Sequence, residues 1–156
     1  MPLRYFGIRV RNLDRSLLFY GQALGLKEVS RGDMSEYGAG RWVLLEDPRT
    51  HQRLELNWYP RSSRFATRYI PGEGLDHIGF LLGKVPRSRL EAEYRRLLGA
   101  GARPTPITPK LTDGWVANVK DPDGNWIEIF RWPTPAEIRA QARADKPKKP
   151  REPKEP

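Results

Sequence analysis

Two glutamates and one histidine stand in the sequence where they could share a chemical task. Glu55 and Glu128 each occupy the middle of an alternating apolar segment, in "LEL" and "IEI", and His77 begins the apolar run "HIGFLL". The other histidine, His51, falls in an expected hairpin turn. One imidazole with two carboxylates is a donor set for a divalent ion such as Zn, Ni, Fe, Mn or Co, and a carboxylate can also move a proton.

An internal repeat relates these residues to one another. "YFGIRV" aligns with "HIGFLL", glycine over glycine, which places Tyr5 over His77. Farther along the chain "LEL" aligns with "IEI" at nearly the same offset, so Glu55 is the equivalent of Glu128. Such self-similarity indicates two copies of one structural unit. If the two copies pack about a pseudo-two-fold axis, these four positions can meet in one cleft.

Each copy is expected to form a strand, a helix and three further strands. The helical segments end at Gly25 and Gly99, and Ser88 with Glu91 predicts a capping box for the second helix. The turns "DPRTHQ" and "DPDG" separate the last two strands of each copy. The expected fold is therefore α+β, with two βαβββ modules in tandem whose curved mixed sheets enclose a cleft.

Side-chain alternation in the last strand leaves one question open. Glu128 shares a face with Trp126 and Phe130, because successive side chains of a strand point to opposite sides. A single alternating strand does not show whether this face meets solvent or a site. The equivalence of Glu128 with Glu55, and the position of His77, favour a site.

The repeat also sets the expected domain organisation. The expected parts are a single domain (1–132) made of module 1 (about 3–60), a linker (61–74) and module 2 (about 75–132), then a C-terminal helix (133–144) and a disordered basic tail (145–156). Thr134 at the N-cap, Pro135 at N1 and Glu137 at N3 predict the start of the C-terminal helix.

Composition narrows the class of protein. The sequence has no cysteine, which excludes a disulfide framework, thiolate ligands and a thiol nucleophile. It has no apolar run long enough to cross a bilayer and no signal-peptide layout, so we expect a cytoplasmic protein without a membrane partner. The formal net charge of +9 favours a small anionic partner, or serves solubility alone. No zinc-finger or RNP1 motif is visible, so nucleic-acid binding is not expected.

Three segments, "RNLDRSLLFYGQALGL", "LDHIGF" and "DPDGNWIEIF", resemble the vicinal oxygen chelate superfamily, which includes glyoxalase I, extradiol dioxygenases and fosfomycin- and bleomycin-resistance proteins. The resemblance covers about residues 3–132. It implies paired βαβββ modules around one divalent metal ion, often across a homodimer. The implied ligand positions are Tyr5, Glu55, His77 and Glu128.

Tyr5 departs from the family pattern, in which this position carries a His or Gln. Three alternatives stay open. The ion can be held by Glu55, His77 and Glu128 with water in the remaining position. The metal can be absent and the cleft used for binding only. Alternatively, Tyr5 can coordinate the ion or donate a proton.

Similarity to glyoxalase I implies a lyase or isomerase acting on a small anionic α-carbonyl or thioester compound. Glu128 is then the catalytic base, Glu55 its partner on the opposite side, and the metal a Lewis acid. Arg9 stands where these enzymes bind a substrate carboxylate, a task that suits a guanidinium. Further candidates for contact with the substrate are Asn57, Trp126 and Phe130.

Two other functions compete with this one. Asn57 stands two residues after Glu55, whereas glyoxalase I usually has an asparagine four residues after, which puts glutathione in doubt. The first alternative is a metal-free module that binds or sequesters a small molecule. An extradiol dioxygenase ranks lower, because its iron site needs two histidines and only His77 lies in an expected strand.

Overall fold

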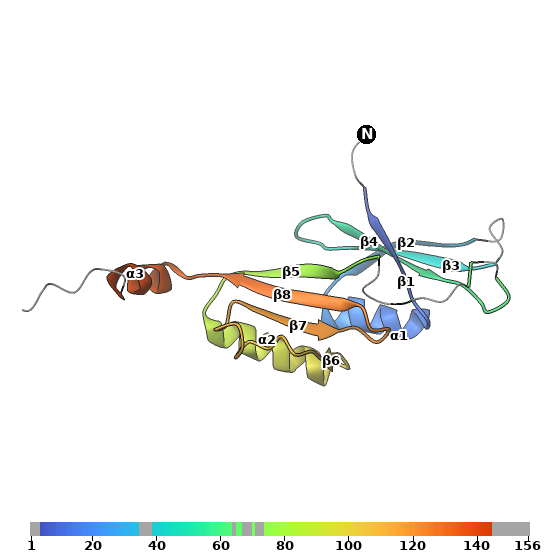
Figure 1. Ribbon diagram of the computed structural model, residues 1–156. Helices are drawn as coiled ribbons and strands as arrows, with labels where there is room; N and C mark the ends of the chain where they lie inside the picture. Colours follow the sequence, from blue (N-terminus) through green and yellow to red (C-terminus); the bar gives the residue numbers. More distant parts are fainter. Residues whose placement is uncertain (1–3, 35–38, 64, 67–69, 71–73, 145–156) are drawn as a thin grey trace, which may run out of the picture.

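The computed structural model describes residues 4–34, 39–63, 65–66, 70 and 74–144, which fold into two βαβββ modules (Figure 1). The elements of module 1 are β1 (Phe6–Arg9), α1 (Leu13–Leu17), the π-helix η1 (Leu18–Ala23), β2 (Lys27–Asp33), β3 (Arg41–Glu46) and β4 (Arg53–Trp58). Those of module 2 are β5 (His77–Lys84), α2 (Arg87–Gly99), β6 (Arg103–Pro104), β7 (Val116–Lys120) and β8 (Trp126–Trp132), followed by α3 (Pro135–Ala144). The predicted α+β fold is confirmed.

The two sheets have the same topology. Their strand orders are β1-β4-β3-β2 and β5-β8-β7-β6. In each sheet the first strand runs parallel to the last, and the other pairs are antiparallel. Gly7 lies opposite Glu55 and Gly79 opposite Glu128, as the repeat requires. No strand of one sheet pairs with the other within the described ranges, so the sheets stay unclosed.

In both modules one face of the sheet is buried under a helix, and no helix of the described residues covers the other face. In Figure 1, α1 and α2 lie on the same side of the two sheets. The buried strand residues that flank the two glutamates are Leu54, Leu56, Ile127 and Ile129. Because side chains alternate along a strand, Glu55 and Glu128 project from the face away from the helices.

The first helix widens after one turn. Asn12 caps its start by accepting a hydrogen bond from the Arg15 amide at 2.9 Å. From Leu18 onward the helix is of the π type, with an i to i+5 bond from the Leu24 amide to the Phe19 carbonyl at 3.2 Å. The wide turn buries Tyr20 completely and leaves Leu18 56% exposed.

The second helix starts differently from the prediction. It begins at Arg87, and the N-cap residue is Pro86, which has no side chain that can accept a hydrogen bond. Ser88 therefore lies inside the helix, and the predicted capping box with Glu91 is wrong. Glu91 instead accepts a hydrogen bond from Arg87 at 3.0 Å. Pro86 supplies the extended backbone that starts the helix, since its ring fixes φ.

The turn between β7 and β8 connects the two modules through two buried carboxylates. Asp121 is 0% exposed and accepts three backbone N–H groups of its own turn at 2.7–2.9 Å. Its other oxygen accepts the hydroxyl of Tyr20 at 2.9 Å. Asp123 accepts the Ser16 hydroxyl at 3.1 Å and the Arg15 guanidinium at 2.7 Å. We call these contacts the inter-module clamp.

Helix α3 is anchored by a buried arginine. Thr134 and Glu137 form a capping box, since each side chain accepts the backbone N–H of the other residue. Arg131 is 4% exposed and donates to Glu137, to the carbonyl of Gly114 and to that of Val85. Hydrogen bonds from Arg131 and from the Thr134 amide lower the pKa of Glu137 from 4.5 to about 2.

The predicted tail (145–156) and part of the predicted linker lie outside the described residues. Of the helices that the structure describes, none is long and apolar enough to span a bilayer.

We expect the inter-module clamp to stabilise the fold measurably. Tyr20→Phe removes one of the two side-chain donors to Oδ2 of Asp121 and leaves the Asn125 amide in place. It should lower the free energy of unfolding by about 1 kcal/mol, and Asp121→Ala by about 3 kcal/mol or more. Urea denaturation measures both. The matched control is Tyr94→Phe on α2, the repeat equivalent of Tyr20. Equal losses for the two phenylalanine variants would contradict this role.

The attachment of α3 through Glu137 should weaken at low pH. Since the pKa of Glu137 is depressed in the folded state, its contribution is complete above the ordinary value of 4.5 and is lost as the pH falls toward about 2. Helical Cα chemical shifts of α3, followed by NMR, should decay in this window. Glu137→Gln should loosen α3 at neutral pH and remove the transition. Glu91→Gln, on α2, should leave it unchanged.

Candidate functional site

The predicted site residues divide between the uncovered faces of the two sheets. β1 and β4 carry Arg9, Glu55 and Asn57, which we call the Glu55 face. β5 and β8 carry His77 and Glu128, which we call the His77–Glu128 pair. The strand registers therefore place each group as the repeat predicts.

The two side chains of the His77–Glu128 pair lie close together, with His77 exposed and Glu128 half-buried. Nε2 of His77 lies 3.9 Å from Oε2 of Glu128, and the two side chains are 40% and 26% exposed. Nδ1 of His77 lies 2.7 Å from a carboxylate oxygen of Asp76. A carboxylate on one imidazole nitrogen fixes the ring and leaves the other nitrogen free to bind a metal ion. Sequence reasoning missed Asp76, although its place directly before the histidine was a signal.

Two glycines make room for the glutamates. Gly79 stands opposite Glu128, and a Cβ added to it would lie 3.4 Å from the ring of Phe130. Gly7 stands opposite Glu55, where an added Cβ would lie 3.1 Å from Nδ2 of Asn57. The aligned glycines of the repeat thus keep the strand beside each carboxylate free of side chains.

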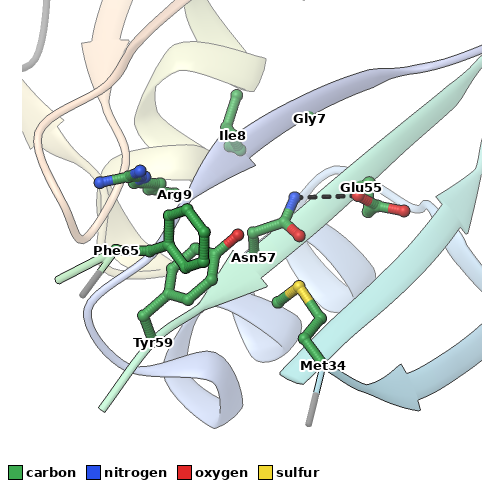
Figure 2. Close-up of a pocket in the computed structure, with 8 residues that line it drawn as sticks. All are labelled: Gly7, Ile8, Arg9, Met34, Glu55, Asn57, Tyr59 and Phe65. Carbon is green, nitrogen blue, oxygen red and sulfur yellow. Dashed lines mark hydrogen bonds between the residues drawn. The ribbon is translucent and has the colours of Figure 1, made fainter. Parts of the chain in front are cut away.

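A cavity of about 440 Å³ opens on the Glu55 face. Figure 2 shows Arg9, Tyr59 and Phe65 gathered at one end, and Glu55 at the other, with Asn57 between them. Nδ2 of Asn57 donates a hydrogen bond to Oε1 of Glu55 at 3.0 Å. This bond orients the carboxylate and leaves its second oxygen for another partner.

The opposite end of this cavity is aromatic and cationic. The guanidinium carbon of Arg9 lies 5.2 Å from the ring centre of Tyr59, a cation–π distance. Tyr59 in turn contacts Phe65, with ring centres 5.7 Å apart at 45°. A cation held beside two aromatic rings in contact can receive an anionic group attached to a flat or apolar body.

Sequence reasoning did not assign Met34 and Phe65, which also line this cavity. Met34 follows β2, and Phe65 comes from the predicted linker. Neither residue belongs to a periodic pattern, so no local signal pointed to them.

The aromatic candidates of β8 lie beside Glu128 rather than in the Glu55 cavity. The Trp126 ring lies 5.4 Å from the ammonium of Lys120. Phe130 packs edge-to-face on Trp132 at 5.9 Å. Both residues are half-buried on the face of Glu128, where they could contact a ligand of the His77–Glu128 pair.

The four predicted ligand positions are not gathered within the chain. Tyr5 precedes β1 and is 46% exposed. His77 and Glu128 form a pair, while Glu55 lies on the other sheet. Among the residues placed by the structure, no three His, Cys, Asp or Glu lie close enough to hold one ion. Convergence of all four positions stays a prediction.

A family model for the Glyoxalase/Bleomycin resistance protein/Dioxygenase superfamily matches residues 3–129. The chain belongs to this superfamily. The resemblance noted from the sequence motifs is thereby confirmed, and the paired modules are those of the glyoxalase fold.

Two superfamily members with related sequences are lactoylglutathione lyases. That of Pseudomonas putida is 31% identical over 149 residues, covering 82% of this chain and 83% of the relative. A probable chloroplastic lactoylglutathione lyase of Arabidopsis thaliana is 28% identical over 129 residues, covering 81% of this chain. The match spans only 35% of the Arabidopsis protein.

Solved structures show the same fold. The trypanothione-dependent glyoxalase I of Leishmania major matches with a TM-score of 0.64 at 24% identity, covering 93% of this chain and 95% of that one. The fosfomycin resistance protein FosX of Listeria monocytogenes matches with a TM-score of 0.60 at 12% identity, covering 88% and 96%. At these identities the likeness establishes the fold alone.

Proposed function

We propose that this protein is a metal-dependent, glyoxalase-like lyase or isomerase acting on a small anionic α-carbonyl or thioester compound. The observation that carries the proposal is the His77–Glu128 pair, with Asp76 on the far nitrogen of the imidazole. Glu55 occupies the equivalent place in module 1 and offers a second carboxylate. The similarity to lactoylglutathione lyase of Pseudomonas putida supports this reaction class.

The donor set fits a divalent ion. One imidazole and two carboxylates suit Zn, Ni, Fe, Mn or Co, and water or the Tyr5 hydroxyl would fill the remaining position. The ion, when bound, supplies Lewis-acid polarisation of the substrate carbonyl.

A homodimer would complete this site. The face of the His77–Glu128 pair also carries Leu81 and Trp132, which are 47% and 52% exposed. Exposed apolar surface of this kind favours an interface. We propose that a second copy covers it and that Glu55 of the partner subunit faces the pair.

The chain's own residues would divide the chemical work. Arg9 binds the anionic end of the substrate and, with Tyr59, holds it at one end of the Glu55 cavity. Glu128 would take a proton from the hydroxyl-bearing carbon beside the carbonyl and return it to the carbonyl carbon. The hydroxyl proton would pass to the former carbonyl oxygen, so that the isomerisation balances without an outside reagent. Asn57 keeps Glu55 oriented.

Metal analysis of protein purified without a histidine tag tests the proposal. We expect one divalent ion per chain, lost in His77→Ala and in Glu128→Ala and retained in His51→Ala, the control histidine. Asp76→Asn should weaken metal affinity by about 10- to 100-fold, since it loosens the imidazole. A metal-free protein that gains no lyase activity with added Ni, Zn, Mn or Fe would overturn the proposal.

Mixing two variants tests the shared site. Glu55→Ala and Glu128→Ala should each bind little metal alone. After unfolding and refolding together, half of the dimers would contain both chains, each with one intact site, so metal content should recover to about one quarter of the native value. No recovery would place Glu55 and the His77–Glu128 pair of one chain in the same site.

A metal-free binding module is the second candidate. The 440 Å³ cavity with Arg9, Tyr59 and Phe65 supports it, since these groups can hold a compact anion without chemistry. In that case ligand binding would need Arg9 and would survive Glu128→Gln.

A further inference from the structure

A second cavity lies at the seam of the two modules, on the side of the helices. It measures about 650 Å³ and is lined by η1, by the residues that follow α2 and by the turn that carries the inter-module clamp. None of its lining residues belongs to the Glu55 face or to the His77–Glu128 pair, whose glutamates lie on the sides of the sheets opposite the buried residues Leu54, Leu56, Ile127 and Ile129. We call this cavity the seam groove.

The floor of the seam groove is apolar and comes mainly from the π-helix. Leu18, Phe19 and Ala23 line it, together with Pro122 of the β7–β8 turn. Leu18 remains 56% exposed although it is a large aliphatic residue. π-helical turns are rare in proteins, and those that are found lie frequently at functional sites. Phe19 and Ala23 are buried beneath it, so Leu18 supplies the apolar surface that is open to water and that favours a ligand with an apolar body.

The rim of the groove is cationic. Arg103, at the start of β6, is exposed and pairs with no carboxylate among the residues whose contacts the structure describes. Arg15 also reaches the groove with a side chain that is 50% exposed, although Asp123 balances part of its charge. Gln22 adds an uncharged amide. One uncompensated guanidinium beside an apolar floor matches one anionic group on an apolar body.

The groove is preformed, because both of its sides are fixed. Arg96 of α2 donates to the carbonyl of Ala23 at the end of η1. On the other side, Arg15 and Ser16 bind Asp123 in the clamp. A ligand would therefore meet a rigid site and lose little affinity to ordering of the protein.

We propose that the seam groove is a second binding site, for a small organic anion with a compact apolar body, such as an aromatic carboxylate or phosphate monoester. The site lies outside the proposed metal centre and takes part in no step of its reaction. Because the groove is lined by both modules, its ligand would also stabilise their relative placement.

Phenyl phosphate is a suitable probe, since it carries a dianionic head on a flat ring. In titrations of the full chain followed by amide chemical shifts, we expect saturable changes at η1, Ala100 and Gly101. Arg103→Gln should raise the dissociation constant by about tenfold, as expected for one lost charge-assisted contact. The control is Arg95→Gln, an exposed arginine of α2 outside the groove, which should leave affinity unchanged.

Further variants separate this site from the proposed metal centre. Leu18→Gln, a change at an exposed position, should weaken phenyl phosphate binding while inorganic phosphate binds poorly to either protein. Glu128→Gln and Arg9→Gln should leave the shifts at η1 intact, whether or not the metal proposal holds. Shifts confined to the Glu55 cavity, equal losses in Arg103→Gln and Arg95→Gln, or equal affinity for inorganic phosphate would overturn the inference.

Discussion

The hydrogen bonds of Asp121 and Asp123 join the two modules, and the position of the first helix of module 1 against the last hairpin of module 2 depends on them. Asp121 is fully buried, and its oxygens serve both its own turn and Tyr20 of the other module. A buried carboxylate is stable only while its partners are in place. The clamp therefore fixes where the first helix of module 1 meets the last hairpin of module 2, which also shapes the seam groove.

The clamp is one-sided, although the modules are alike. In the repeat, Asp47 corresponds to Asp121 and Tyr94 to Tyr20. Asp47 accepts the Arg49 amide of its own turn at 2.8 Å, in an exposed hairpin, and no hydrogen bond joins it to Tyr94 within the described part of the chain. The last hairpin of module 2 thus binds the first helix of module 1, whereas the described residues show no equivalent bond from the last hairpin of module 1 to Tyr94 of α2. Equivalent residues of the two modules are of the same type but make different contacts, because their surroundings differ.

Because side chains alternate along a strand, each sheet has one face that packs into the core and one face that carries the candidate site residues. Residues beside the glutamates build the core under the helices, while Glu55 and Glu128 stand on the uncovered side. A glycine in the neighbouring strand keeps each carboxylate accessible. The segment "DPDGNWIEIF" shows both roles at once, since its aspartates join the modules and its glutamate pairs with His77.

The sequence by itself determined the modules and, for the candidates other than Tyr5, the strand that carries each one and the face on which it lies. These follow from alternation and from the repeat, which are local properties of the chain. It did not predict Asp76 beside His77, Pro86 as the N-cap of α2, or the contribution of Met34 and Phe65 to the Glu55 cavity. Only the tertiary structure showed that His77 pairs with Glu128 while Glu55 lies on the other sheet, and that the DPDG turn binds α1. Those relations join residues far apart in the chain, so they depend on how the modules pack and on which buried polar groups find partners.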